Sequence, residues 1–191
     1  MNNTVNILIV GVGGQGTILA SRILGYVAQR LAKDVKVSEI HGMSQRGGSV
    51  VTQVRYGDKI YAPVIAKGTA DIIIGFEKLE TLRWAGYLKK GGILVVNDQE
   101  IDPMPVIMGV AHYPKNIDAI LSKETLLRIP ALTIAKEIGN QKAANVVLLG
   151  AVARSLGHDA SLWEEALEQA VPEKFLAINR VAFQRGYGYE G

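Results

Sequence analysis

The apolar and polar positions change their period along the chain, and the N-terminal part shows the clearest pattern. Asn6–Val10 is an apolar run of strand length that ends at Gly11. The segment Thr17–Leu31 places its apolar residues at helical spacing on one face. The sequence therefore predicts a strand, a glycine-rich turn and a helix in succession.

The middle of the chain predicts short strands separated by turns. Apolar or alternating runs favour strands over Val35–Ile40, Ser49–Tyr56, Ile60–Ile65, Asp71–Gly75 and Ile93–Val96.

Between the last two of these strands, the spacing of leucines predicts a helix over Glu77–Lys90. The segment Lys89–Gly92 would close that helix, because cations and glycine both suit a helix C-terminus. Further along, we expect a partly helical Asn116–Leu127, a short strand over Leu127–Pro130 and a short helix over Thr133–Ile138.

The C-terminal third predicts helices only. Ala143–Leu156 is apolar almost all round, so we expect it in the core or in a subunit contact. A second helix begins with Ser161 and Glu164, a pair typical of a capping box. Pro172 suits the first turn of a last helix that runs to about residue 184.

The alternation of strands and helices predicts an α/β fold, namely a three-layer Rossmann-like domain with a mixed, mostly parallel sheet and a helical C-terminal third. The hairpin-like strand Ser49–Tyr56 suggests the antiparallel member. We expect one domain over residues 1–186 and a flexible tail over residues 187–191.

Composition narrows the classes of function. Of 191 residues, 48% are hydrophobic and 20% are charged, which suits a folded domain. A net charge of +3 without a run of lysine or arginine argues against nucleic-acid binding. The N-terminus lacks the features of a signal peptide and no apolar segment is long enough to span a bilayer, so we expect a cytoplasmic protein that does not bind membranes. With no cysteine, the chain can form no disulfide and hold no thiolate-ligated cluster.

The first segment that could carry chemistry is the glycine-rich turn. Residues 11–16 match G-x-G-x-x-G, follow a strand and open a helix whose free N–H groups attract anions. An acid at the end of the second strand stands where a ribose-binding residue would lie. A tight turn that binds nothing explains the glycines equally well. The candidate phosphate- or coenzyme-A-binding residues are Gly11, Gly13, Gly14, Gln15, Gly16 and Glu39.

The second segment is the polar, glycine-containing loop that follows the second strand. Its arginine can hold a carboxylate or a phosphate in a two-pronged hydrogen bond, and its histidine can exchange a proton near neutral pH. A solvated loop whose glycines serve only the turn is the alternative. The candidate active-site residues are His41, Ser44, Gln45, Arg46, Gly47 and Gly48.

Other polar residues carry weaker signals. His112 and His158 stand alone without ligand spacing, so no metal site is predicted. Asn145 lies inside an apolar helix, where it either caps that helix or bonds across an interface. Trp84 and Trp163 are interpreted as packing residues. No hydrolase or kinase motif is present.

Taken together, the two glycine-containing loops, residues 11–16 and 42–48, resemble the gamma domain of 2-oxoacid:ferredoxin oxidoreductases. Tyr113–Asn116, Ile138–Asn140 and Asn145–Gly150 are also similar to that family. The resemblance covers about Val5 to Gly186. A free-standing gamma domain of this length most resembles the small subunit of the indolepyruvate type.

The resemblance implies a division of labour. A large thiamine diphosphate and iron–sulfur subunit would bind thiamine diphosphate, Mg²⁺ and the 4Fe-4S clusters. The assembled enzyme would decarboxylate an aryl 2-oxoacid, reduce ferredoxin and form an acyl-coenzyme A. The resemblance assigns no cofactor to the small subunit. This subunit would be inactive alone and would complete the active site through Ser44, Gln45 and Arg46.

The resemblance leaves the assembly and the substrate open. A heterodimer, a dimer of heterodimers and a homodimer of the isolated chain are all compatible with the sequence. An independent NAD(P)-binding dehydrogenase is the alternative function, supported by the glycine turn and Glu39. A nucleotide sensor or scaffold without catalytic activity is a third.

Overall fold

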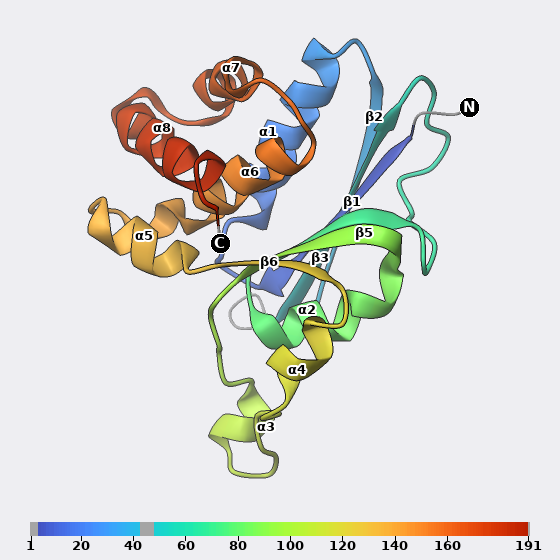
Figure 1. The fold of residues 1–191 in the computed structure, drawn as a ribbon, viewed down its shortest axis with the longest axis vertical. Helices are drawn as coiled ribbons and strands as arrows, with labels where there is room; N and C mark the ends of the chain where they lie inside the picture. The colour runs from blue at the N-terminus through green and yellow to red at the C-terminus, as the bar shows by residue number, and fades with distance from the viewer. Residues whose placement is uncertain (1–3, 43–47, 191) are drawn as a thin grey trace.

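A six-stranded sheet divides the molecule into layers (Figure 1). The computed structural model describes residues 4–42 and 48–190. The strands are β1 (Val5–Val12), β2 (Asp34–His41), β3 (Ser49–Gly57), β4 (Ala70–Gly75), β5 (Leu88–Asn97) and β6 (Thr125–Ile129). Their spatial order is β2-β3-β1-β4-β5-β6.

The sheet is parallel except for the two pairings of β3. β1, β4, β5 and β6 pair in parallel, whereas β3 lies antiparallel between β2 and β1, with Val5 opposite Tyr56 and Val12 opposite Ser49. The prediction of a mixed, mostly parallel sheet with the third strand reversed is therefore confirmed.

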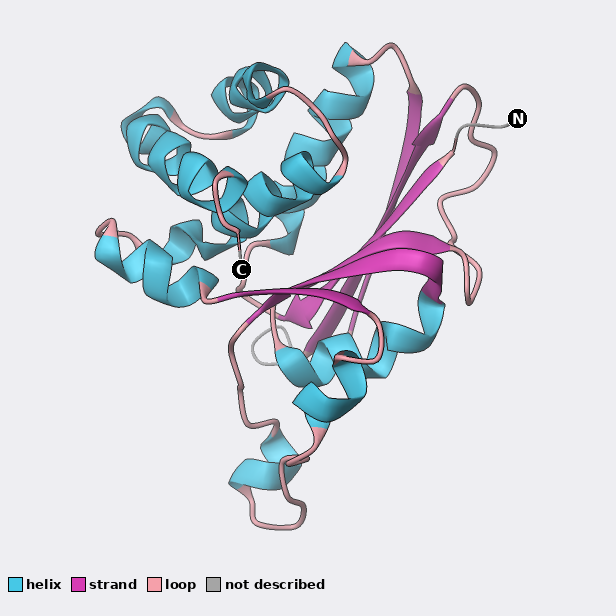
Figure 2. Ribbon diagram, viewed as in Figure 1, coloured by secondary structure: helices cyan, strands magenta, loops and turns pink. Residues whose placement is uncertain are grey.

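Helices cover both faces of the sheet (Figure 2). The larger layer contains the long helices of the C-terminal third, and the smaller layer lies below the sheet in Figure 1. The larger layer is α1 (Thr17–Arg30), α5 (Ala131–Glu137), α6 (Ala144–Ser155), α7 (Ala160–Ala170) and α8 (Glu173–Tyr187). The smaller layer is α2 (Lys78–Trp84) and α4 (Ile117–Leu121), and the remaining short elements are α3 (Met104–Ile107), η1 (Ala85–Tyr87) and η2 (Gln141–Ala143).

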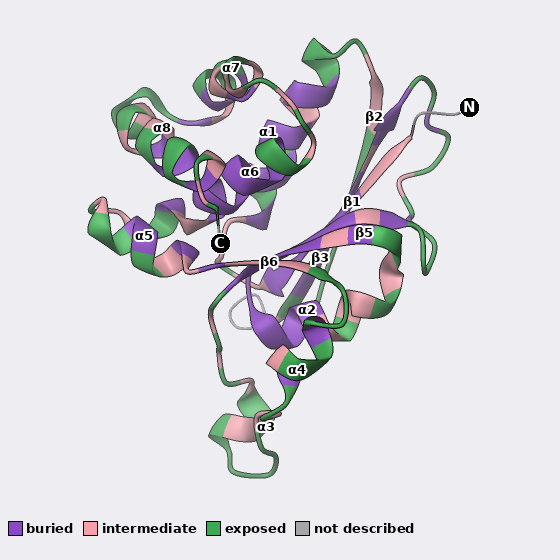
Figure 3. Ribbon diagram, viewed as in Figure 1, coloured by how far each residue is buried: buried purple, intermediate pink, exposed green. Residues whose placement is uncertain are grey.

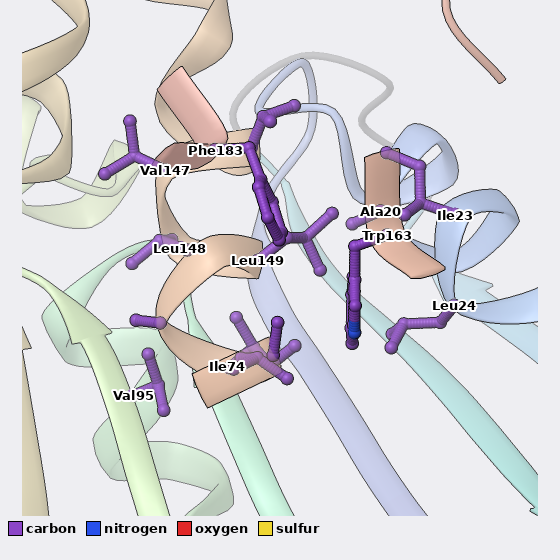
Figure 4. Packing of buried hydrophobic residues seen from close by; sticks show 14 of the residues in the cluster. Ala20, Ile23, Leu24, Ile74, Val95, Val147, Leu148, Leu149, Trp163 and Phe183 are labelled. Carbon is purple, nitrogen blue, oxygen red and sulfur yellow. The ribbon is translucent and has the colours of Figure 1, made fainter. Parts of the chain in front are cut away.

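The main core lies between the sheet and the larger layer, where side chains from α1, α6, α7, α8 and the sheet share one cluster (Figures 3 and 4). Leu149 of α6 is fully buried, and the rings of Trp163 and Phe183 stack with their centroids 6.1 Å apart. The apolar helix Ala143–Leu156 is therefore a core helix, one of the two places that its sequence favoured.

The predicted helix Glu77–Lys90 is wrong in its second half. α2 ends at Trp84, and after η1 the chain is already extended at Leu88, which pairs with Ala70. The glycines that were expected to close the helix instead form an irregularity at the start of β5. A Cβ at Gly92 would lie 2.9 Å from the Asp71 carbonyl oxygen, so the close approach of two strands requires glycine there.

The segment Ile60–Ile65 is not a strand. Its backbone groups bond to side chains instead of a neighbouring strand, since Asp34 accepts from Ile60 N at 2.8 Å and Gln53 accepts from Ile65 N at 2.7 Å. These bonds fold the segment over one face of β3.

Two predictions about the C-terminal helices are wrong in detail. The capping box fails because α7 begins at Ala160, so Ser161 already lies inside the helix, and Glu164 bonds to Gln184. The last helix continues to Tyr187, because Gly186 allows α8 to contact the backbone of Val147, where a Cβ would have no room.

The end of the chain that the structure describes lies against the domain rather than apart from it. Arg154 donates to the Tyr189 carbonyl at 3.0 Å, and the Tyr187 hydroxyl donates to the His158 carbonyl at 3.1 Å.

Candidate functional site

A cleft of about 410 Å³ opens at the carboxyl ends of β1, β4 and β5. The residues that line it follow each of these strands: Gly14–Gly16 after β1, Phe76 after β4, and Gln99 after β5. The chain leaves β1 toward the larger helical layer and leaves β4 toward the smaller one. The cleft therefore lies where the direction of the connections reverses, which is where open α/β sheets bind ligands.

The glycine turn forms the wall of this cleft on the side of α1. Gly16 precedes α1 in a left-handed conformation (φ 88°), and a Cβ there would lie 2.4 Å from Asn145 Nδ2. Gly11 lies inside β1, where a Cβ would lie 2.9 Å from the Phe76 Cβ. Gly16 thus serves the contact between two helices, and Gly11 serves the contact between the end of β1 and the start of the β4–α2 connection.

Gln15 braces the turn from within. Its Oε1 accepts from Val12 N at 2.8 Å, and its Nε2 donates to the Phe76 carbonyl at 3.1 Å and to Gln99 Oε1 at 3.3 Å. The amide therefore links the loops that follow three parallel strands. Gln15 was predicted as a binding residue, and its observed contacts are those of a residue that positions the turn.

Asn145 joins the cleft to the core helix α6. Its Nδ2 donates to the Gly16 carbonyl at 3.2 Å, while its Oδ1 is buried without a hydrogen-bond partner among the described residues. Asn145 is 4% exposed and lines the cleft. The N-terminus of α1 attracts anions, and Asn145 adds an acceptor that lacks a donor. The sequence singled out Asn145 by its polarity but did not predict this contact with the glycine turn.

Only the ends of the arginine-containing loop are described. Gly13 N donates to the Gly48 carbonyl at 2.9 Å, and Gly42 N donates to the Ser49 carbonyl at 3.2 Å. The loop therefore starts and ends beside the glycine turn. Ser44, Gln45, Arg46 and Gly47 lie outside the described residues, so their roles stay predictions.

His41 and Glu39 lie on β2, at the sheet edge. His41 is exposed, and its Nδ1 lies 3.4 Å from the Gly42 carbonyl oxygen. Glu39 accepts from Thr52 Oγ1 at 3.0 Å and from Thr17 Oγ1 at 3.5 Å. In a dinucleotide fold the ribose-binding acid follows the strand next to β1, whereas here β3 separates β2 from β1. This order gives no support to the dehydrogenase alternative.

Below the cleft, the start of α2 holds the connection between β5 and α4. Glu77 is 1% exposed. Its Oε2 caps α2 by accepting from Glu80 N at 2.8 Å, and its Oε1 accepts from Ile101 N at 3.3 Å and from the Tyr113 hydroxyl. Burial, followed by this hydrogen bond to Glu77, raises the pKa of Tyr113.

Lys78 holds the same connection through ion pairs. Its Nζ lies 2.7 Å from Asp98, 3.3 Å from Glu100 and 3.4 Å from Asp118, and its side chain is only 9% exposed. Burial disfavours the ammonium, but hydrogen bonds to Asp98 and Glu100 outweigh this effect, so the pKa of Lys78 lies above its ordinary value.

Glu80, one turn further along α2, holds the start of β3. Its Oε2 accepts from Ser49 Oγ at 2.5 Å, directly after the arginine-containing loop. Burial, with a smaller effect of the Glu77 charge, raises the pKa of Glu80 although Ser49 and Arg83 oppose the shift. Nothing in the local pattern marked Glu77, Lys78 or Glu80 as more than surface positions of a helix.

A second groove of about 650 Å³ adjoins the cleft on the side of α8. The two share Leu19 and Lys142. Phe175 is 44% exposed in this groove, and the Lys174 Nζ lies 4.9 Å from the centre of its ring. Two lysines and an aromatic face thus extend the cleft away from the glycine turn.

Over residues 4–42 and 48–190, no group of three or more histidine, aspartate or glutamate side chains is placed to hold a metal ion. No helix of the same ranges has the length and apolarity needed to cross a membrane.

Comparison with known proteins shows the family. The model of the pyruvate ferredoxin/flavodoxin oxidoreductase family matches residues 6–189. The indolepyruvate oxidoreductase subunit IorB of Pyrococcus horikoshii is 42% identical over 188 residues, which cover 95% of this chain and 93% of that protein.

Solved structures agree on the fold. The gamma subunit of a keto/oxoacid ferredoxin oxidoreductase from Geobacter sulfurreducens matches with a TM-score of 0.71 and 27% identity, covering 96% of each chain. A 2-oxoglutarate:ferredoxin oxidoreductase from Magnetococcus marinus matches with the same TM-score at 21% identity, which shows the fold alone. There the match covers 98% of this chain and 31% of that chain.

Proposed function

Since this chain belongs to the pyruvate ferredoxin/flavodoxin oxidoreductase family and is the small subunit of a 2-oxoacid:ferredoxin oxidoreductase, we propose that it completes the active site of a larger subunit that acts on indolepyruvate or a related aryl 2-oxoacid. The observation that carries the choice of substrate is the 42% identity to an indolepyruvate oxidoreductase subunit over nearly the whole of both chains. Ferredoxin as the electron acceptor supports a cytoplasmic location.

The redox groups belong on the larger subunit in this proposal. Iron–sulfur clusters need thiolate ligands, and this chain has no cysteine. It also has no Gly-Asp-Gly sequence with a following asparagine, the usual motif for thiamine diphosphate and its magnesium ion. The residues present therefore do not fit either group, and this chain contributes binding and positioning only. We propose a heterodimer or a dimer of heterodimers as the assembly.

Coenzyme A is the ligand that we assign to the cleft. Its diphosphate would lie at the N-terminus of α1, where backbone N–H groups and the helix dipole favour an anion. Lys142 at the shared rim and Lys174 in the adjoining groove supply positive charge, and Phe175 offers a face for the adenine. The thiol end of such a ligand would leave along the carboxyl edge of the sheet, toward the larger subunit.

The arginine-containing loop is assigned to the substrate. The end of the loop at Gly48 lies beside the glycine turn, because Gly13 N donates to the Gly48 carbonyl, and this contact supports the assignment. A guanidinium there would neutralise the carboxylate of the 2-oxoacid or a phosphate of coenzyme A. The assignment of Ser44 and Gln45 as its neighbours in that site stays a prediction.

Reconstitution tests the proposal. The isolated chain, the larger subunit and their complex would be assayed for ferredoxin reduction with indolepyruvate, phenylpyruvate, pyruvate and 2-oxoglutarate. We expect activity only from the complex, only with coenzyme A, and highest with an aryl substrate. Activity of the isolated chain, or micromolar binding of NAD(H) to it, would favour the dehydrogenase alternative.

A charge variant tests the ligand assignment. Lys142→Ala should raise the KM for coenzyme A about fivefold with little change in kcat, because one charge near a phosphate contributes about 1 kcal/mol. Lys59→Ala is the matched control. It removes an exposed lysine near the amino end of β1, at the other end of the strands from the cleft. Equal effects of the two substitutions on the KM for coenzyme A would show that coenzyme A does not bind in this cleft.

A further inference from the structure

The connection between β5 and α4 carries an exposed apolar projection. Residues 102–112, which include α3, extend away from the body of the molecule and are mostly exposed (Figures 1 and 3). Four large apolar side chains in this projection are between 60% and 73% exposed: Met104, Ile107, Met108 and Val110. Residues 103–111 contain no charged side chain. Single exposed apolar residues are common on soluble proteins, but a contiguous group indicates a binding surface.

The projection is ordered by its own backbone. Pro103 O accepts from Val106 N at 2.8 Å, Met108 N donates to Met104 O at 2.9 Å, and Val110 N donates to Pro105 O at 3.0 Å. These bonds hold the backbone in consecutive turns, while the apolar side chains stay exposed. The exposure is therefore a property of a folded element.

Both ends of the projection are attached to the same buried carboxylate. Glu77 Oε1 accepts from Ile101 N just before the projection and from the Tyr113 hydroxyl just after it. Lys78 adds ion pairs to Asp98 and Glu100 on the incoming side. Burying charged groups is unfavourable unless they are paired, so their use here indicates that the position of the projection matters.

We propose that residues 102–112 are a docking element that inserts into an apolar recess of the larger partner subunit. This inference rests on the proposed function, because it takes the existence of that subunit from it. Methionine enrichment and the absence of charge are typical of the core of a protein–protein interface. The projection also continues the cleft, since Ile101 at its base lines that cavity.

Two partners could cover the projection: the larger subunit or a second copy of this chain. The larger subunit is favoured because the same fold also occurs as part of a longer polypeptide. In the Magnetococcus marinus enzyme, the match to this chain covers 31% of one chain, so the same fold is there attached to other parts of one enzyme. Such a chain holds other parts of the same enzyme next to this fold, and these parts favour a partner other than a second copy.

The test compares two variants of the full-length chain in binding to the purified larger subunit. Ile107→Asp/Val110→Asp places charge at the centre of the projection. Val181→Asp places charge at another exposed valine, 49% exposed on α8, and is the matched control. Circular dichroism and thermal unfolding verify that both variants fold like the wild type.

We expect the double variant to weaken the complex about 30-fold or more, as for residues at the centre of an interface, and Val181→Asp to leave the dissociation constant unchanged. Equal binding of wild type and double variant would overturn the docking element while leaving the proposed function intact. Failure of the wild type itself to bind the larger subunit would overturn both. A wild-type homodimer that the double variant dissociates, with binding to the larger subunit retained, would assign the projection to a second copy and contradict the inference.

Discussion

The two helical layers of this protein differ in what they bury. The layer of α1, α6, α7 and α8 buries apolar side chains and brings backbones into direct contact: a Cβ at Gly150 would lie 2.2 Å from the Phe183 carbonyl oxygen. The smaller layer buries charged side chains beside its apolar ones: Glu77 as the cap of α2, and Lys78 and Glu80 within this helix of seven residues.

This difference separates two tasks. Apolar burial contributes most of the free energy of folding, and it increases with the area that a layer covers. Buried charges contribute little net stability but leave few alternative arrangements, because every carboxylate needs its donors. We infer that the larger layer holds the sheet together, while the smaller layer fixes the loops at its carboxyl edge.

The largest expected effect lies in the larger layer. Gly150→Ala forces α6 away from the backbone of α8, so we expect the free energy of unfolding to fall by about 3 kcal/mol or more. Gly25→Ala is the matched control, because its Cβ would meet nothing within 4 Å on α1 and alanine favours a helix by about 1 kcal/mol. Urea unfolding measures both. A Gly150→Ala variant as stable as the wild type would refute the close α6–α8 contact.

The next effect is the response of the larger layer to alkaline pH. Burial, and then the charge of Asp71, raises the pKa of Tyr56 from 10.0 to about 12. The unfolded chain releases this proton first, so stability is lost as the pH rises from 10.0 to about 12, by about 2–3 kcal/mol. Tyr56→Phe does not titrate and should lose less over that range, measured as the difference in unfolding free energy between the two proteins. Parallel curves would show that Tyr56 is exposed.

In the smaller layer, Glu77→Gln should destabilise the protein by about 2 kcal/mol, because the α2 cap and the bonds to Ile101 and Tyr113 are weakened together. Amide exchange should quicken over residues 101–113 before it changes in α6. Uniform quickening over the whole chain would mean that Glu77 serves general stability and would remove the distinction between the layers.

The smallest effect concerns Glu80. Because burial raises its pKa above the ordinary 4.5, the folded state keeps the proton to higher pH than the unfolded state, and stability falls as the pH rises through that interval. Glu80→Gln does not titrate, so it should gain stability relative to the wild type as the pH rises from about 4 to about 7. Guanidinium unfolding at both pH values measures this gain, and a relative loss would contradict it.

Local patterns predicted the elements that depend on local periodicity. The first strand, the glycine turn, α1, the reversed third strand and the buried α6 were all expected from spacing and composition. The second half of Glu77–Lys90 failed because the pairing of Leu88 with Ala70 is a long-range contact. The segment Ile60–Ile65 failed because Asp34 and Gln53 supply its hydrogen bonds from distant strands.

The site was predicted in part for the same reason. The glycine motif located one wall of the cleft, and the family resemblance is confirmed by the relatives. The bracing role of Gln15 depends on Phe76 and Gln99, which only the fold brings near, and the contact of Asn145 with Gly16 joins residues 129 positions apart. No period or spacing carries such information.

The central claim is that the carboxyl edge of the sheet faces the larger subunit. Amide hydrogen exchange of this chain, alone and in the complex, tests it most directly. We predict added protection over residues 13–19 and 101–112 and none over residues 57–69 at the opposite edge. Protection confined to residues 57–69, with residues 13–19 and 101–112 unchanged, would contradict the account.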